Sequence, residues 1–252
     1  MMEATTSAGA EGRYLYELTG EDGASVCPFV WRVKFALAQK GLSYESREIG
    51  FLEIPRILDG SYKSVPVMVD QGQALGDSWL IADYLDEAYS DCPPLFKCSS
   101  ERAMMRFVDN WLNTQILPKL LTIYVLDIHN RARSVDRGYF RQTREARLGR
   151  TLEEVHSGRD SLVLELRAAL SPLRQTLALQ RFLGGGQPSY GDFMVAGVLM
   201  WGASVGTTAM LEHSDPLLPW AERCLDLYGG VGRQIALPAL KTVPTTALGR
   251  PL

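Results

Sequence analysis

The chain has 252 residues, of which 46% are hydrophobic and 22% charged, and its net charge is −3. This composition is typical of a folded globular protein, and the length is sufficient for two domains. The small negative charge gives no electrostatic reason to expect nucleic acid or an anionic membrane as a partner, and no apolar run approaches the roughly 20 residues that span a bilayer.

The N-terminal residues and the cysteines bear on location. Residues 1–12 are small and polar without an apolar run, so we expect a disordered leader and no secretory signal. The four cysteines, Cys27, Cys92, Cys98 and Cys224, lack the paired spacing of a zinc site. We therefore expect no metal, reduced thiols and a cytoplasmic protein, with a Cys92–Cys98 disulfide as the less favoured alternative.

Residues 13–89 have the pattern of a small α/β domain. Residues 13–18 and 44–49 alternate as strands do, and residues 28–41 between them have helical spacing and end at a glycine. This order predicts a parallel βαβ unit. Residues 65–69 and 73–75 predict a hairpin, with a cis peptide before Pro66. Asp77 and Ser78 then cap another helix, whereas residues 51–58 are ambiguous, one interpretation being a short helix interrupted at Pro55.

The pattern after residue 90 is helical. Residues 90–100 predict a linker, because serines and two prolines interrupt the apolar periodicity. Residues 101–131 predict a long helix kinked at Pro118, and residues 139–179 a second one broken near Pro172. The glycines at 184–186 predict a plain loop, since they lack the lysine and hydroxyl of a phosphate loop.

The last helices have clearer boundaries. Ser189 and Asp192 predict a capping box before an apolar helix at 193–203, which should run through the domain core. Asp215 and Pro216 predict the start of another helix that continues through Leu227. The tail at 229–252 is rich in glycine and proline, and we expect little order beyond about residue 240.

Cys27 is the residue around which a site is expected. It precedes Pro28, which suits the first turn of a helix, so Cys27 falls at the N-cap. Unpaired backbone N–H groups and the helix dipole at that position lower the pKa of a thiol and favour the thiolate. The alternative is that Cys27 is a small buried hydrophobic residue.

These motifs resemble those of the cytosolic glutathione transferases over residues 13–233. The runs Cys-Pro-Phe-Val-Trp-Arg at 27–32, Asp-Ser-Trp-Leu-Ile-Ala-Asp-Tyr-Leu-Asp at 77–86 and Asp-Asn-Trp-Leu at 109–112 are most similar to the β-etherase-like branch. That branch contains bacterial enzymes that cleave lignin-type aryl ethers with glutathione, and the fungal FuA class associated with wood phenolics. The resemblance implies a thioredoxin-like α/β domain at 13–89, a linker at 90–100, an all-α domain at 101–252 and a symmetric homodimer.

The resemblance also implies which residues bind glutathione, the expected co-substrate. The turn at Val65–Pro66 would offer its backbone to the cysteine of glutathione, and Asp77–Ser78 would hold the γ-glutamyl end. General chemistry agrees, because a strand edge can pair with an extended peptide and a helix start suits a carboxylate. The remaining candidates are Pro28 and Phe29 beside Cys27, with Arg56 and Lys63 as basic partners for the glycyl carboxylate.

A hydrophobic aromatic substrate is expected against the helices after residue 100. Trp111, Tyr124, His129 and Trp201 are the candidates for its site, although aromatic residues at helical spacing more often belong to a core. His129 near a helix end also suits a favourable C-terminal charge. The basic residues at 131–150 are most simply a solvated face or part of a subunit contact.

Two mechanisms and three functions remain open. The Cys27 thiolate attacks as in cysteine-type relatives, or a hydroxyl such as that of Ser25 hydrogen-bonds the glutathione thiolate as in serine-type relatives. The main hypothesis is a transferase that acts on aromatic or phenolic electrophiles by conjugation, etherase-like displacement or reductive cleavage. The alternatives are a ligandin-type protein that sequesters polyphenols, and a regulatory scaffold without chemistry, which the intact Val65–Pro66 and Asp77–Ser78 motifs argue against.

Overall fold

The computed structural model describes residues 12–234 and begins with a four-stranded sheet of order β2-β1-β3-β4. The strands are β1 (Tyr14–Leu18), β2 (Glu45–Ile49), β3 (Val67–Asp70) and β4 (Gln73–Gly76). β1 and β2 are parallel, whereas β3 is antiparallel to both β1 and β4. The predicted βαβ unit and hairpin are therefore confirmed.

Three helical segments complete this part of the chain. α1 (Pro28–Lys40) connects the parallel strands and ends at Gly41, whose positive φ of 67° favours glycine. The ambiguous segment forms a 3-10 helix, η1 (Phe51–Arg56), with Pro55 inside it. α2 (Ser78–Ala88) follows the hairpin, and the peptide between Val65 and Pro66 is cis. These elements give the expected thioredoxin-like arrangement.

The first predicted long helix is interrupted twice. It consists of α3 (Ser99–Trp111), a π-helical segment η2 (Leu112–Ile116), α4 (Leu117–Ile123) and α5 (Val125–Arg131). Pro118 lies in the first turn of α4, which continues directly from the π-helical segment, so the change of helix geometry lies just before the proline. A second break occurs at Tyr124, whose φ of −103° and ψ of 12° leave the helical region.

The prediction of a second long helix is wrong, because this part of the chain forms several shorter helices. It is divided into α6 (Arg137–Leu148), α7 (Leu152–Ser157), α8 (Arg159–Ala169) and α9 (Ser171–Leu179), preceded by a 3-10 turn η3 (Ser134–Asp136). Besides the expected break near Pro172, breaks occur at Gly149, with φ 67°, and at Gly158. The left-handed conformation of Gly149 favours glycine, whereas Gly158, with φ −93° and ψ 8°, has a backbone conformation that other residues also adopt.

α10 (Tyr190–Val205) is buried along its whole length and forms the centre of the helical part. Its predicted capping box is present: the Ser189 N–H and hydroxyl both donate to Asp192 Oδ2, at 2.9 and 3.0 Å. The next helix, α11 (Leu218–Leu225), begins later than expected, and Asp215 accepts the Leu217 N–H before it. α12 (Leu227–Gly230) and the 3-10 turn η4 (Val231–Gln234) end the described chain.

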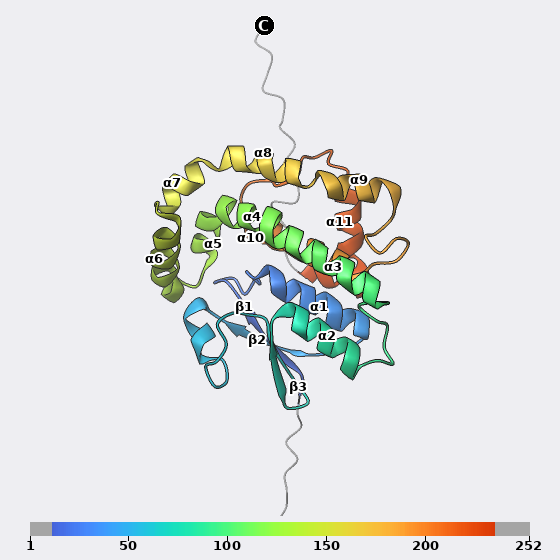
Figure 1. The fold of residues 1–252 in the computed structure, drawn as a ribbon. Helices are drawn as coiled ribbons and strands as arrows, with labels where there is room; N and C mark the ends of the chain where they lie inside the picture. Colours follow the sequence, from blue (N-terminus) through green and yellow to red (C-terminus); the bar gives the residue numbers. More distant parts are fainter. Residues whose placement is uncertain (1–11, 235–252) are drawn as a thin grey trace, which may run out of the picture.

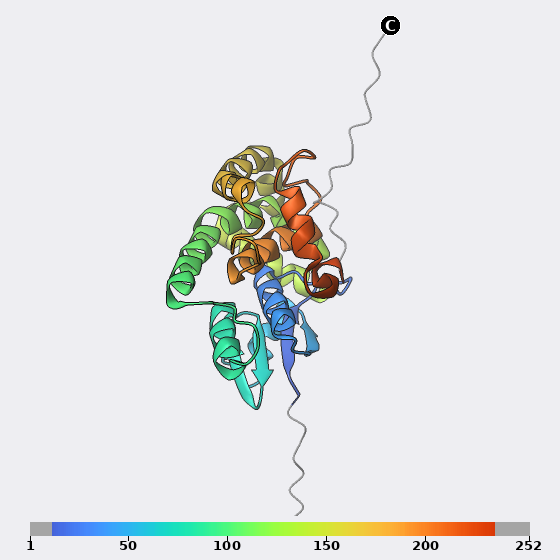
Figure 2. The ribbon, with the colours of Figure 1, turned by 90° about the vertical axis from the view of Figure 1, so that its right-hand side faces the viewer.

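The two parts meet along α1. α1 packs against α2 on one side and along α10 on the other, so the helix that starts at the proposed site is shared by both cores (Figures 1 and 2). A buried ion pair between Arg32 and Asp109, 2.6 Å long, joins α1 to α3. No helix within residues 12–234 is long and apolar enough to cross a bilayer. The expected leader, apart from Gly12, and the tail beyond residue 234 lie outside the described residues.

Candidate active site

Cys27 is the N-cap of α1, as the sequence predicts, and it is 7% exposed. Its Sγ donates to the carbonyl oxygen of Val65 at 3.6 Å, which brings the helix start against the cis-proline turn. Burial raises the pKa of the Cys27 thiol to about 11, and this outweighs the N–H groups of Val30 and Phe29 and the charge of Arg32, which lower it. The expected thiolate is therefore not the resting form of Cys27, because desolvation disfavours the charged state.

The second candidate for handling a sulfur is Ser25, two residues before Cys27. It is 3% exposed, it pairs with Thr19 in an isolated antiparallel bridge, and its hydroxyl has no hydrogen-bond partner among the described residues. Ser25 does not line the cavity in front of Cys27. Of the two candidates for handling a sulfur, Cys27 is the one that faces open space in this structure.

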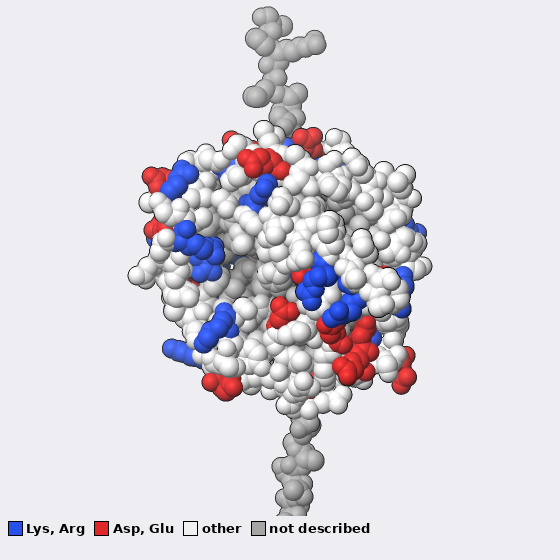
Figure 3. Space-filling model, in the orientation of Figure 1, with Lys and Arg blue, Asp and Glu red and all other residues white. Residues whose placement is uncertain are grey.

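That cavity has a volume of about 280 Å³ and lies between the sheet domain and the helices α4, α5, α6 and α10. Figure 3 shows a hollow between the two halves of the molecule, with Lys and Arg side chains beside it. Six of the expected site residues line the cavity: Cys27, Pro28, Phe29, Lys63, Val65 and Trp201. They bring the thiol, the proline turn and one basic group to the same opening.

Trp201 is the only one of the four expected aromatic substrate residues at this cavity. Tyr124 is buried, and its hydroxyl donates to the Thr208 carbonyl at 2.7 Å, so it belongs to the core. Trp111 lines a separate cavity of about 200 Å³ between α3 and α9. His129 stands outside the cavity, with Nδ1 3.0 Å from the Asn130 amide oxygen and its ring 6.3 Å from that of Phe140.

Asp77 and Ser78 form the start of α2 and do not line the cavity. The Asp77 carboxylate accepts the N–H groups of Trp79 and Leu80 at 2.8 and 3.2 Å, with φ at 71°. Ser78 is buried, and its carbonyl accepts the Tyr190 hydroxyl at 2.9 Å. Of the two basic candidates, Lys63 is exposed at the cavity and donates to the Gly60 carbonyl at 3.3 Å, whereas Arg56 is exposed elsewhere.

The wall opposite Cys27 contains residues that the sequence interpretation missed. Phe140, Arg144 and Arg147 of α6 line the cavity, together with Phe51 of η1. The Arg144 guanidinium lies 4.4 Å from the ring centre of Phe140 and 5.3 Å from that of Phe51. The spacing of four and three residues along one helix face is the signal that places these three side chains together.

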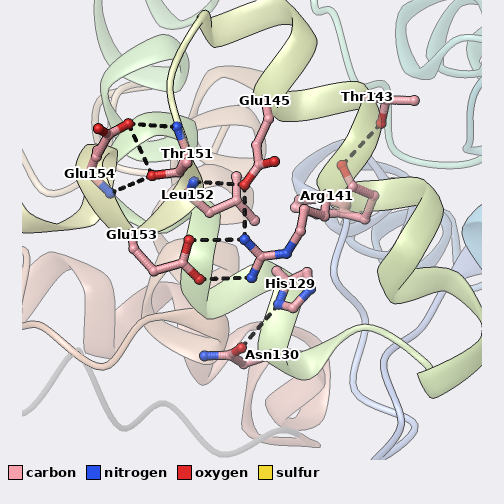
Figure 4. Close-up of polar contacts among 10 residues, drawn as sticks. His129, Asn130, Arg141, Thr143, Glu145, Thr151, Leu152, Glu153 and Glu154 are labelled. Atoms are coloured by element: carbon pink, nitrogen blue, oxygen red, sulfur yellow. Dashed lines mark hydrogen bonds and ion pairs between the residues drawn. The ribbon is translucent and has the colours of Figure 1, made fainter.

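Polar contacts at the outer side of α6 hold this wall to α7 (Figure 4). Arg141 donates to Glu145 at 2.8 Å and to both carboxylate oxygens of Glu153 at 2.8 and 2.9 Å. The hydrogen bonds from Arg141 lower the pKa of Glu153 to about 2. Glu145 also accepts the Leu152 N–H at 3.1 Å, so the α6–α7 turn is tied at both ends.

Comparison with known proteins agrees with this arrangement. A family model described as the glutathione S-transferase N-terminal domain matches residues 23–93, and one described as the glutathione S-transferase C-terminal domain matches residues 103–216. Glutathione S-transferase U7 of Arabidopsis thaliana is 28% identical over 182 residues, which cover 71% of this chain and 68% of that protein. The probable glutathione S-transferase parA of Nicotiana tabacum is 25% identical, covering 79% and 80%.

Solved structures show the same architecture. The glutathione transferase GSTFuA2 of Phanerochaete chrysosporium has a TM-score of 0.70 and 25% identity, and the match covers 89% of this chain and 95% of that one. CsGST63524 of Ceriporiopsis subvermispora, solved in complex with glutathione, also has a TM-score of 0.70, at 21% identity and with coverage of 88% and 94%. The second likeness bears on the fold alone.

Proposed function

Because the chain belongs to the glutathione S-transferase family, we propose that it binds glutathione beside Cys27 and directs the thiolate of the tripeptide at hydrophobic aromatic electrophiles. The observation that carries this proposal is the cavity itself. It starts at the N-terminus of α1 and the cis-proline turn and continues into apolar side chains of α4, α5 and α10. A thiol peptide and an apolar acceptor would thus meet at one opening.

The glutathione side of the site uses backbone groups. Val65 precedes the cis proline and lines the cavity, so an extended peptide can pair with this turn. Lys63, two residues earlier, supplies a positive charge for a carboxylate of glutathione. The assignment of Asp77 and Ser78 to the γ-glutamyl end rests on the family motif at the start of α2, since neither residue lines the cavity. Arg56 also lies away from the cavity, so Lys63 is the stronger of the two basic candidates.

Cys27 has two chemically distinct roles open to it. In the first role, the neutral Cys27 thiol donates a hydrogen bond to the glutathione thiolate, which stays the nucleophile. The N–H groups of Phe29 and Val30 at the helix start support the negative charge on that sulfur. Alternatively, Cys27 is itself deprotonated on binding and attacks the sulfur of a glutathione conjugate or of glutathione disulfide. The mixed disulfide then forms as the other bond to that sulfur breaks, and the leaving group departs with the electron pair and takes up a proton. We favour the first role, since the raised pKa of Cys27 keeps its proton near neutral pH.

The proposed reaction is a displacement. The glutathione sulfur forms a bond to the electrophilic carbon, and the leaving group departs with the electron pair of the bond that breaks. With an aryl ether the leaving group is an aryloxide, which takes up a proton to become a phenol. Stabilisation of the thiolate and exclusion of water by the apolar wall supply the catalytic effect.

A direct assay tests this function. Purified protein is incubated with glutathione and 1-chloro-2,4-dinitrobenzene, and in parallel with a β-aryl ether whose leaving group is a fluorescent phenol. We expect thioether formation above the uncatalysed rate and saturation with glutathione. Failure to bind glutathione in calorimetry, together with no thioether from either acceptor, would refute the transferase proposal.

The ligandin alternative is supported by the same neutral thiol. A buried Cys27 that donates to Val65 and has a pKa of about 11 is poorly prepared to react, whereas the apolar cavity still suits a polyphenol. Tight polyphenol binding with negligible conjugation of both acceptors would favour sequestration over catalysis.

We also propose that the chain forms a homodimer through α2 and α3. Leu80, Met104 and Phe107 are 58%, 60% and 68% exposed on these helices, which are joined by bidentate hydrogen bonds between Arg102 and Asp83. An apolar patch beside charges of both signs is suited to a self-complementary two-fold contact. Sedimentation of the wild type and of Phe107→Glu tests this face: a dimer that persists in the variant would contradict it.

A further inference from the structure

The cavity beside Cys27 has an asymmetric charge. Among residues 12–234, its lining includes three basic residues, Lys63, Arg144 and Arg147, and no Asp or Glu. Lys63 lies on the glutathione side, before the cis-proline turn, whereas Arg144 and Arg147 come from α6 on the opposite, helical side. The acceptor wall therefore has a positive charge that a neutral hydrocarbon would not require.

Arg144 is held in place without an acidic partner. Its guanidinium lies against the rings of Phe140 and Phe51, and its Nη1 donates to the Thr143 hydroxyl at 2.8 Å. Within residues 12–234 neither Arg144 nor Arg147 forms an ion pair, although several arginines elsewhere on the chain do, including Arg141 one turn away. Burial, and next the charge of Arg147, lower the pKa of Arg144, which is the effect expected of a cation without a counter-charge.

Building on the proposed function, we infer that the acceptor site prefers aromatic compounds with an anionic group, such as an aromatic carboxylate, over neutral compounds of the same shape. The ring would lie in the apolar part of the cavity near Trp201 and Leu121, and the anionic group would meet Arg144 and Arg147. A planar guanidinium held by two aromatic rings presents its free N–H groups in the fork geometry that carboxylates accept.

The same arginines could instead serve a carboxylate of glutathione. Their position argues against this, because the cis-proline turn and Lys63 lie on the sheet side of the cavity while the arginines lie on α6. The test therefore measures the dissociation constant of glutathione separately from the preference between acceptors. A rise in the glutathione dissociation constant, with acceptor preference unchanged, would overturn the inference.

The binding experiment uses two fluorescent probes that differ by one sulfonate, 8-anilinonaphthalene-1-sulfonate and the neutral N-phenyl-1-naphthylamine. The variants are Arg144→Gln, Arg147→Gln and the double variant, with Arg150→Gln as a control that removes an exposed charge near the same helix but away from the cavity. Since hydrogen bonds between charged groups are stronger than neutral ones, we expect the double variant to bind the anionic probe about tenfold more weakly or worse.

The neutral probe and Arg150→Gln should stay within about twofold of the wild type, the spread expected of exposed charges. Arg147 is exposed, so its variant keeps the test valid even if loss of the Arg144 stacking impairs folding. The preference for the anionic probe should also fall as ionic strength rises. Equal weakening of both probes, or of neither, would overturn the inference.

A turnover measurement tests whether the preference for an anionic group also applies to the acceptor that reacts with glutathione. The acceptors are 4-chloro-3-nitrobenzoate and its methyl ester: glutathione sulfur bonds to the carbon that holds chlorine, chloride leaves with the electron pair, and the thiol proton passes to solvent. We expect the double variant to lower kcat/KM for the acid relative to the ester. A protein that forms no thioether but keeps the probe preference refutes the transferase and leaves the anion site standing; turnover without any preference refutes the anion site alone.

Discussion

The indole Nε1 of Trp201 donates a 2.8 Å hydrogen bond to the carbonyl oxygen of Val26, and both residues are buried. Val26 immediately precedes Cys27, and Trp201 belongs to α10 in the centre of the helical domain. The helical core thus holds the residue before the thiol, while both Val26 and Trp201 line the cavity. The position of Cys27 consequently depends on the contact between the two domains.

Replacement of Trp201 by Phe removes this donor and leaves the Val26 carbonyl buried without it. We expect a loss of unfolding free energy of about 1–3 kcal/mol, the cost of an unsatisfied buried polar group, and a lower kcat/KM. Denaturant unfolding and thioether kinetics measure the two effects. Trp111→Phe is the control, because Trp111 lines the separate cavity between α3 and α9. Unchanged kinetics in Trp201→Phe would contradict this role.

The pKa of Cys27 predicts slow alkylation. With a pKa of about 11, the thiolate fraction at pH 7 is about one part in ten thousand. The rate of reaction of Cys27 with iodoacetamide should therefore rise steadily with pH through 9 and 10, without a plateau near neutral pH. Peptide mass spectrometry separates Cys27 from the exposed Cys98, which serves as the internal reference. A plateau for Cys27 below pH 8 would show that an activated thiolate exists in the free protein.

Substitutions at Cys27 and Ser25 distinguish the two sulfur mechanisms. Cys27→Ser keeps a donor at the N-cap and should retain thioether formation, whereas Cys27→Ala should lower kcat by about 100–1000-fold, the range for loss of a donor to a stabilised anion. Ser25→Ala should be nearly silent, because the Ser25 hydroxyl is buried outside the cavity. The readouts are kinetics and the spectroscopic pKa of bound glutathione.

The opposite pattern would reassign the chemistry. A mixed disulfide between Cys27 and glutathione, lost in Cys27→Ser together with activity, would indicate that Cys27 is the nucleophile. A large decrease of kcat/KM in Ser25→Ala would mean that the Ser25 hydroxyl contacts the glutathione sulfur.

The local motifs were predictable because each depends on neighbours in the sequence. Pro28 fixed the start of α1, and Ser189 with Asp192 fixed the capping box of α10, since these effects act within one helical turn. The fold class followed from the order of these elements and from the family resemblance. The lengths of the later helices did not follow, because Gly149 and Gly158 interrupt a periodicity that continues through them.

The site was less predictable because it depends on contacts between distant segments. The low pKa expected for Cys27 came from its helix position, while its burial depends on how both domains pack around it. Similarly, Tyr124 lies in an apolar helical pattern that fits a core residue as well as a substrate-binding residue. Its hydrogen bond to the Thr208 carbonyl in the structure shows that it belongs to the core. The basic face of α6 was expected to be solvated, since sequence alone does not show that Phe51 of η1 lies opposite it.

Asp192 is predicted to be the most sensitive polar residue of the helical domain. It is fully buried and accepts hydrogen bonds from the Leu183, Gly184 and Ser189 N–H groups and from the Trp220 indole. Asp192→Asn would turn an amide donor toward these donors, so we expect a loss of about 3–5 kcal/mol, as for a broken buried polar network. Asp226→Asn, at an exposed carboxylate, is the control for denaturant unfolding. Similar unfolding midpoints in the two variants would contradict this assignment.

Gly197 sets the distance between α10 and α1. A Cβ atom at Gly197 would lie 3.1 Å from both the Pro28 carbonyl oxygen and the Trp31 Cβ, so α1 would have to move. Alanine is favoured over glycine inside a helix by about 1 kcal/mol, whereas overpacking costs about 1–3 kcal/mol. The two atoms it meets are backbone oxygen and Cβ, which cannot rotate away, so the overpacking cost should exceed the helical gain.

We therefore expect Gly197→Ala to lower the unfolding free energy by about 1 kcal/mol net of the helical gain. Because Pro28 follows Cys27 directly, the same shift should lower kcat/KM. Gly138→Ala is the matched control: nothing lies within 4 Å of its added Cβ, so it should be neutral or stabilising. If Gly197→Ala were instead more stable than the wild type and fully active, the contact between α1 and α10 would not fix the geometry of the thiol, and the dependence of the site on domain packing would be lost.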